Sequence, residues 1–225
     1  MRPDQVTIHL IDPNRVIDVD VHLTAEEKSR AAGFRFEADS RHWAACRTAL
    51  RLVLAEACRI APHEIPITLG ANGKPVLGDP FSHLHFNLSH CRDLALVAVA
   101  MEPVGIDLER LDRAMDLIGC ESTFCHPGEL EGLPADQGAR AVSLLEIWTA
   151  KESVLKALGT GFLLPPEEVS IELGEETGRA SSPHGLAHLS SLRIHRLRHS
   201  ALSAHTAFVA APASIGEISF RTDRI

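Results

Sequence analysis

The hydrophobic pattern of the chain predicts strands at both ends of the sequence and near its middle. Residues 6–10 alternate apolar and polar side chains as a strand does. The apolar run LALVAVAM at 94–101 is typical of a strand that is buried on both faces. The polar segment 174–190 predicts the tip of a hairpin, and two final strands follow at 191–198 and 203–212.

Helical periodicity dominates two other segments. Residues 38–59 repeat apolar side chains every three or four positions, and Arg47 and Arg51 fall on the opposite face, where they could bind an anion or simply be solvated. Residues 141–158 form a second amphipathic pattern. A shorter helical pattern covers residues 111–124.

A capping box at Thr24 and Glu27 predicts a short helix that ends near Ala32. With this helix included, the order of strand, helix and several strands occurs twice, with a break at Pro103. We therefore expect an α+β protein with two similar-sized parts, an N-terminal subdomain over residues 1–103 and a C-terminal subdomain over 104–225.

Composition and charge exclude several classes of protein. The 225 residues are 45% apolar and carry a net charge of -8 without a basic tail, which argues against general nucleic-acid binding. The five cysteines include no C-x-x-C pair, so we expect neither a disulfide scaffold nor a zinc finger. The run at 94–101 is too short to cross a membrane, and the N-terminus lacks the apolar stretch of a signal peptide. These features predict a soluble cytoplasmic protein.

The segment VGIDLE at residues 104–109 predicts a strand with two carboxylates on one face. Asp107 and Glu109 are two residues apart, or roughly 6–7 Å along a strand, so both could reach one hard cation. Gly105 on the same face leaves room for a ligand or for another backbone. The alternative is a strand end with two solvated acids, because so short a motif often arises by chance.

The helix around residues 147–156, IWTAKESVLK, brings charge to an apolar segment. Trp148, Glu152 and Lys156 recur every four residues and share one face, while Lys151 lies about 100° around the helix from Glu152. An exposed Glu152–Lys156 pair, worth about 0.3–0.5 kcal/mol, is the alternative interpretation. A third carboxylate with lysines on a packed helix also suits a site for magnesium and phosphate.

VGIDLE and, some forty residues later, WTAKESVLK together resemble the signature of 4′-phosphopantetheinyl transferases of the larger, surfactin-synthetase-activating type. Four further segments resemble blocks of that family in the same order, namely FRFEADSRHWAACRTALR at 34–51, GKP at 73–75, FNLSHC at 86–91 and GTGFLLP at 159–165. The resemblance covers roughly residues 23–170. It implies a pseudo-dimer of two α/β subdomains with the active site in the cleft between them.

The resemblance also implies an activity. Enzymes of this family transfer the phosphopantetheine arm of coenzyme A to a serine of an acyl or peptidyl carrier protein, using magnesium, and release adenosine 3′,5′-bisphosphate. The larger type is usually monomeric. Coenzyme A, Mg²⁺ and a carrier protein are therefore the expected ligands and partner, and neither a nucleic acid nor a membrane is expected.

Matching the motifs residue by residue implies roles for individual side chains. Asp107, Glu109 and Glu152 would hold magnesium, and Lys156 would contact the diphosphate with some help from Lys151. The coenzyme A nucleotide would be held by Lys74, Ser89 and His90. Arg30 and Arg41 would contact its 3′-phosphate, with His42 as the alternative to Arg41. Lys28 would make a weaker contribution. The catalytic residues would be Asp107, Glu152 and Lys156, with Glu152 the first candidate for the general base and Glu129 the second.

Two other functions compete with the transferase. One is a non-catalytic module of the same fold that binds coenzyme A or a carrier protein. The other is a different magnesium-dependent phosphoryl enzyme, but the segment GANGKP at 70–75 is not a Walker A motif because Pro75 stands where Ser or Thr is required. The presence of all three acids together with Lys156 favours the transferase.

Overall fold

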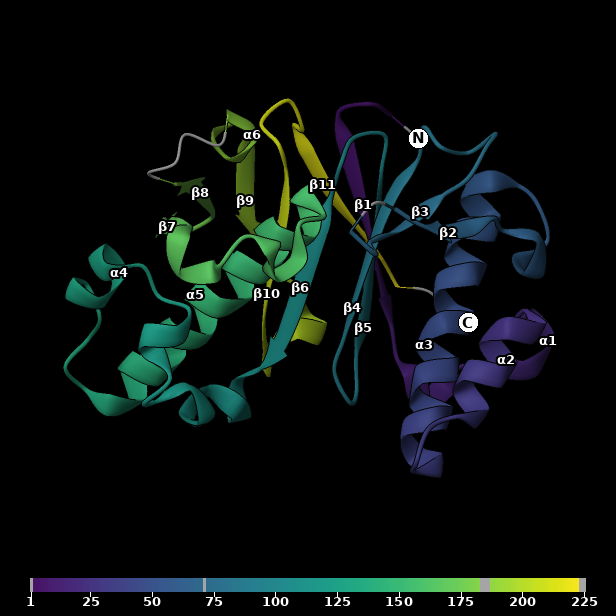
Figure 1. Ribbon diagram of the computed structural model, residues 1–225, viewed down its shortest axis with the longest axis horizontal. Helices are drawn as coiled ribbons and strands as arrows, with labels where there is room; N and C mark the ends of the chain where they lie inside the picture. Colours follow the sequence, from purple (N-terminus) through teal and green to yellow (C-terminus); the bar gives the residue numbers. More distant parts are fainter. Residues whose placement is uncertain (1, 71, 183–186, 223–225) are drawn as a thin grey trace.

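Two β-sheets pack face to face between two long helices (Figure 1). The computed structural model describes residues 2–70, 72–182 and 187–222. The first sheet has the strand order β11-β1-β5-β4 and the second has the order β6-β10-β9-β8-β7. Mixed helices and sheets in this arrangement confirm the predicted α+β class.

The elements of the first part of the chain are β1 (Gln5–Ile11), α1 (Val19–His22), α2 (Ala25–Ala32), α3 (Glu37–Cys58), β2 (Ile67–Leu69), β3 (Pro75–Leu77), β4 (His85–His90) and β5 (Ala95–Ala100). The second part contains β6 (Gly105–Arg110), α4 (Pro127–Glu131), α5 (Gln137–Leu158), β7 (Ser170–Leu173), β8 (Thr177–Ser181), α6 (Ala187–Ser190), β9 (Leu192–Arg196), β10 (His205–Pro212) and β11 (Glu217–Thr222).

The core has three apolar layers. Helix α3 covers the outer face of the first sheet, with Leu50 and Leu54 packed against Val97 and its neighbours in β5. Helix α5 covers the outer face of the second sheet, where Val154 packs near Phe208 of β10. The inner faces of the sheets meet in a third cluster built from β1, β5, β6 and β10. A buried strand such as β5, with all six residues inaccessible, is apolar on both faces because it contacts two layers.

The last strand returns to the first sheet. Strand β11 pairs in parallel with β1, with Gln5 opposite Glu217 and Leu10 opposite Thr222. Residues 217–222 therefore belong to the sheet formed mainly by residues 5–100, although they follow the second sheet in sequence. The assignment of subdomains at 1–103 and 104–225 remains a prediction.

Two local predictions need correction. Residues 111–124 form two 3₁₀ segments, Leu111–Leu117 and Glu121–Thr123, rather than an α-helix, and Gly119 between them has a φ of 89° that no right-handed helix accepts. The expected hairpin tip at 174–190 contains the strand β8 and the short helix α6, while residues 183–186 lie outside the described part. Ala71 of the expected GANGKP turn also lies outside it.

Helix α2 begins as predicted. The Thr24 hydroxyl accepts a hydrogen bond from the Glu27 amide, and the Glu27 carboxylate accepts one from the Thr24 amide. The same carboxylate pairs with Arg47 and Arg51 of α3, and Arg51 is buried. The arginine face of α3 is therefore a contact between two helices rather than an open anion-binding surface.

Gly105 allows α5 to lie directly on β6. A Cβ atom at this position would stand 2.1 Å from the Ser153 carbonyl oxygen and 2.2 Å from the Ala157 nitrogen. Both atoms belong to the backbone of α5 and cannot rotate away. The glycine is thus required by the close approach of a helix to a strand, and this approach places Asp107 beneath Lys156.

We expect the substitution Gly105→Ala to destabilise the fold by about 3 kcal/mol, because overpacking a rigid contact forces the backbone to move. Gly216→Ala is the matched control, since a Cβ there would meet nothing within 4 Å. Urea denaturation of both variants measures the difference. Equal stability of the two variants would show that α5 does not rest on β6 as described.

Candidate active site

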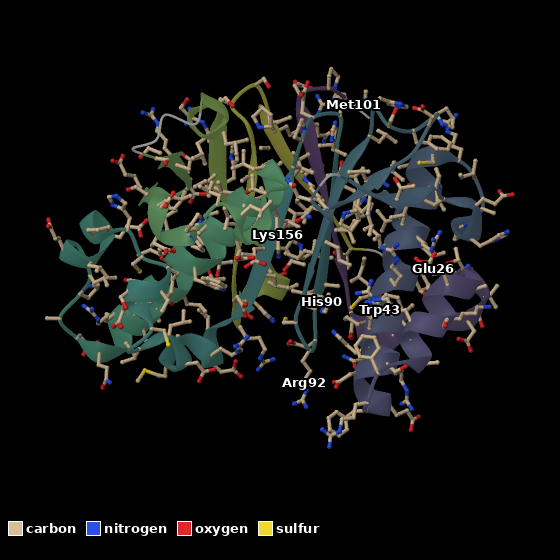
Figure 2. All side chains as sticks on the ribbon, viewed as in Figure 1. Glu26, Trp43, His90, Arg92, Met101 and Lys156 are labelled. Atoms are coloured by element: carbon tan, nitrogen blue, oxygen red, sulfur yellow. The ribbon has the colours of Figure 1, made fainter. Side chains whose placement is uncertain are left out.

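Three elements line one cavity of about 260 Å³ where the edge strands of the two sheets meet. Strand β4 contributes Ser89 and His90, strand β6 contributes Asp107 and Glu109, and helix α5 contributes Trp148, Glu152 and Lys156. The shared helix face predicted for Trp148, Glu152 and Lys156 therefore opens onto the cavity. Figure 2 shows Lys156 and His90 toward the middle of the molecule, with Trp43 of α3 beyond His90.

The side chains of β4 join it to the edge of β6 in the other sheet. The Asn87 side-chain oxygen accepts a hydrogen bond of 2.8 Å from the Ile106 amide, and the Ser89 hydroxyl accepts one of 3.2 Å from the Leu108 amide. The two bonds repeat every second residue on both strands, as the strand period requires. They satisfy backbone amides that have no neighbouring strand on this side. We call this contact between Asn87, Ser89 and the β6 backbone the seam.

Asp107 is the most enclosed carboxylate of the cavity. Its Oδ1 atom accepts hydrogen bonds from the Ser89 hydroxyl at 2.8 Å and from Lys156 Nζ at 2.5 Å. Its Oδ2 atom is buried and has no hydrogen-bond partner among the described residues. A buried carboxylate oxygen without a donor is costly, and a bound cation would satisfy it.

Glu109 and Glu152 lie close enough to Asp107 to interact electrostatically with its carboxylate. Burial raises the pKa of each glutamate, and the negative charge of Asp107 raises it further. The positive charge of Lys156 lowers the pKa of both glutamates and so opposes this shift. For Glu109, the charge of Arg113 and a hydrogen bond donated by Trp148 also lower the pKa. Three acids outnumber the one lysine of this cavity, so the donor set fits a hard divalent cation such as Mg²⁺.

The three carboxylates are spread more widely than a closed coordination shell. We call Asp107, Glu109 and Glu152 the acidic triad. Among the described residues, two groups of histidine, cysteine or acidic side chains have all their ligand atoms within 4.8 Å of one another, and the acidic triad is not one of these groups. The triad shares a cavity wall, and side-chain rotation on β6 and α5 would be needed to gather its oxygens.

A second cavity of about 320 Å³ adjoins the first and shares Leu88, Glu152 and Lys156 with it. Lys74 and Gly159 also line this second cavity. The Lys74 ammonium donates hydrogen bonds to the Val104 and Ala157 carbonyl oxygens at 3.0 and 3.1 Å, and burial lowers its pKa to about 8. The structure therefore brings Lys74 beside the site and also gives it a role in joining the β2–β3 hairpin to α5 and to Val104, just before β6.

The expected arginines lie outside both cavities. Arg30 stacks over the Trp43 ring at 5.3 Å, and Arg41 pairs with Glu37 at 2.7 Å in an exposed helix pair. His42, the alternative to Arg41, is closer to the site, because its Nε2 atom lies 3.1 Å from His90 Nδ1.

Lys151 and Glu129 occupy a different part of the protein from the one expected. The Lys151 side chain is fully buried, and its ammonium pairs with Glu129 at 2.7 Å and donates to the Phe124 and Pro166 carbonyl oxygens. Glu129 also accepts hydrogen bonds from the His126 and Ile171 amides. Glu129, on α4, is thus not part of the cavity wall, and its pair with Lys151 connects α4 to α5 instead of contacting a phosphate.

Asn87 is a site residue that the sequence reasoning missed. Its alternation with Ser89 in FNLSHC was a signal, because two polar residues on one face of an otherwise apolar strand require partners. The partner strand β6 could not be identified from one sequence.

Within the described residues, no helix is both long and apolar enough to span a bilayer.

Comparison with known proteins bears on the same residues. Residues 103–210 match the model of the 4′-phosphopantetheinyl transferase superfamily, and residues 16–102 match a model described as "4′-phosphopantetheinyl transferase, N-terminal". Together the two matches include every element that lines the cavity.

Curated relatives extend this likeness. The chain is 38% identical to 4′-phosphopantetheinyl transferase HetI of Nostoc sp. over 162 residues, which are 69% of this chain and 67% of that protein. It is 30% identical over 142 residues to a putative 4′-phosphopantetheinyl transferase of Synechocystis sp., covering 62% of this chain and 58% of that one. It is 23% identical over 154 residues to 4′-phosphopantetheinyl transferase Sfp of Bacillus subtilis, covering 68% of this chain and 68% of that one. The chain belongs to the 4′-phosphopantetheinyl transferase superfamily.

Proposed function

We propose that this protein transfers the 4′-phosphopantetheine group of coenzyme A to a serine hydroxyl of an acyl or peptidyl carrier protein, with Mg²⁺ as cofactor. The observation that carries the proposal is the single cavity in which Asp107, Glu109 and Glu152 meet Lys156. Family membership supplies the reaction, and the cavity supplies a set of side chains suited to it.

Asp107, Glu109 and Glu152 would hold the magnesium ion. The unpartnered Oδ2 atom of Asp107 and the raised pKa values of the two glutamates support this assignment. A bound Mg²⁺ would neutralise part of the diphosphate charge and polarise the reacting phosphorus centre.

Lys156 is positioned to bind the diphosphate. Its ammonium is part-exposed at the cavity wall, 2.5 Å from Asp107 Oδ1 and 3.4 Å from the Ser89 hydroxyl. As the bond between the pantetheine phosphate and the adenosine bisphosphate breaks, negative charge grows on the leaving group, and a lysine beside it lowers the barrier. Ser89, His90 and Lys74 line the same pair of cavities and would hold the nucleotide.

Glu152 would act as the general base. The carrier serine must lose a proton as its oxygen attacks phosphorus, because an un-ionised hydroxyl is a weak nucleophile. Burial and the charge of Asp107 raise the pKa of Glu152, so a carboxylate oxygen of Glu152 that does not contact the metal would accept a proton more readily than that of an ordinary glutamate. Glu129, the second candidate, is held in its buried pair with Lys151.

The protein would work as a cytoplasmic monomer. All five cysteines are free thiols, which suits a reducing compartment. The competing function, a non-catalytic module that binds coenzyme A or a carrier protein, is less well supported, because a binding module has no need for three carboxylates and a lysine at one point.

Incubation of an apo carrier protein with this protein, coenzyme A and Mg²⁺ should add one phosphopantetheine group to the carrier, and chelation of the metal should prevent the addition. Mass spectrometry of the intact carrier measures the product. A thermal-shift assay separates binding from catalysis, and we expect stabilisation by coenzyme A with Mg²⁺ but not by ATP with Mg²⁺. Stabilisation without transfer to any of several carriers would favour the binding module.

The substitution Glu152→Gln should lower kcat by two or more orders of magnitude, since it removes a metal ligand and the base while keeping the side-chain shape. Glu146→Gln is the matched control on the same helix, because Glu146 pairs with Arg196 away from the cavity. Steady-state kinetics at saturating Mg²⁺, with melting temperatures for both variants, tests the role. A near-normal kcat for Glu152→Gln would remove Glu152 from the mechanism.

As the pH is lowered, activity should be lost at a higher pH than the pKa of an ordinary glutamate would give. Protonation of Glu109 or Glu152 removes a ligand, and their raised pKa values move this loss upward in pH. Mg²⁺ binds the ionised forms, so saturating metal should move the acid limb to lower pH. Profiles of kcat/KM at low and saturating Mg²⁺ make the comparison, and superimposable acid limbs would contradict it.

A further inference from the structure

His42, Cys46 and His90 form a compact group beside the cavity, and the proposed reaction gives a role to His90 alone. His42 and Cys46 are one helical turn apart on α3, and His90 ends β4. Their ligand atoms all lie within 4.8 Å of one another. Cys46 is buried at 1% exposure, whereas His90 is exposed, so the group extends from the core to the surface.

The spacing of these atoms matches a tetrahedral zinc site. With Zn–N bonds of about 2.0–2.1 Å and a Zn–S bond of about 2.3 Å, tetrahedral angles separate two nitrogens by about 3.3 Å and a nitrogen from sulfur by about 3.6 Å. His42 Nε2 lies 3.1 Å from His90 Nδ1 and 3.6 Å from Cys46 Sγ. Both of these distances therefore match a coordination shell, and the third pair of donors, on Cys46 and His90, lies within 4.8 Å.

The chemistry of the donors selects the metal. Two imidazoles and one thiolate are preferred by Zn²⁺ and related transition metals, whereas Mg²⁺ prefers oxygen. Asp39 on the same helix adds negative charge near His42, and Lys156 adds positive charge near His90, although Lys156 is paired with Asp107. The acidic triad lacks nitrogen and sulfur ligands, so the two groups differ in the metal that each favours.

We propose that His42, Cys46 and His90 bind one Zn²⁺ ion through His42 Nε2, Cys46 Sγ and His90 Nδ1, with a fourth position open to solvent or to a ligand. Binding converts the Cys46 thiol to a thiolate and releases its proton. The site has three protein ligands and an open position, unlike a structural zinc site with four protein ligands.

Zinc at this position would regulate the site next to it. His90 lines the same cavity as Glu152 and Lys156. A metal-bound imidazole cannot also contact the coenzyme A nucleotide through the same nitrogen, so zinc should weaken coenzyme A binding. This consequence rests on the proposed function, whereas zinc binding itself does not.

Titration of the full chain with Zn²⁺ against a chromophoric chelator tests the site, and Co²⁺ substitution reports the thiolate through its charge-transfer absorption. We expect one tight equivalent in the wild-type protein. Cys46→Ala should weaken affinity about 100-fold and abolish the charge-transfer band, since loss even of a supporting group costs 10–100-fold. Cys58→Ala, which alters another buried cysteine of α3, is the matched control and should retain both.

Absence of a tight equivalent in the wild-type protein, or an unchanged band in Cys46→Ala, would overturn the site and leave an ordinary histidine–histidine hydrogen bond. The regulatory consequence has its own readout. One equivalent of Zn²⁺, in excess Mg²⁺, should raise KM for coenzyme A in the wild-type protein but not in Cys46→Ala. Equal sensitivity of the two proteins would assign the inhibition to the acidic triad and reject regulation through His90.

Discussion

The proposed active site depends on how the edges of two separate sheets are joined. Strands β4 and β6 belong to different sheets, so no backbone ladder connects them, and the Asn87 and Ser89 side chains take its place. Buried backbone amides left unpaired at this seam would cost about 1–3 kcal/mol each. The Ser89 hydroxyl accepts from the β6 backbone and donates to Asp107, so one side chain both holds the sheets together and orients a carboxylate of the site.

The seam and the Gly105 contact together concentrate charge in a small volume. Gly105 brings α5 onto β6, which sets Glu152 and Lys156 above Asp107. The carboxylates repel one another and are partly desolvated, and the raised glutamate pKa values are the result. A fold under no functional demand would avoid such an arrangement. In the proposed reaction, a divalent cation and an anionic substrate would bind together and recover the free energy that this arrangement costs.

Sequence reasoning was most successful where local physics decides the structure. The capping box at Thr24, a strand over residues 104–109 and a helix over residues 141–158 could be predicted without knowledge of distant contacts, and the structure contains all three. Partners across the fold could not be predicted in this way. Lys151 was expected at the diphosphate but is buried against Glu129, and Arg51 was expected on an open face but pairs with Glu27. Each error concerns a long side chain whose direction depends on an element far away in sequence. Strand β11 was not predicted at all, because the two strands expected last end at residue 212, and its parallel pairing with β1 joins segments from opposite ends of the chain.

We propose that one cation and one diphosphate bind where β4, β6 and α5 meet. A crystal structure of the protein with coenzyme A and Mg²⁺ is the most direct measurement of it. We expect electron density for a metal ion bound by oxygens of Asp107, Glu109 and Glu152, with the coenzyme A diphosphate in contact with that ion and with Lys156. Density for the diphosphate at any other surface, or a metal ion bound without these carboxylates, would contradict it.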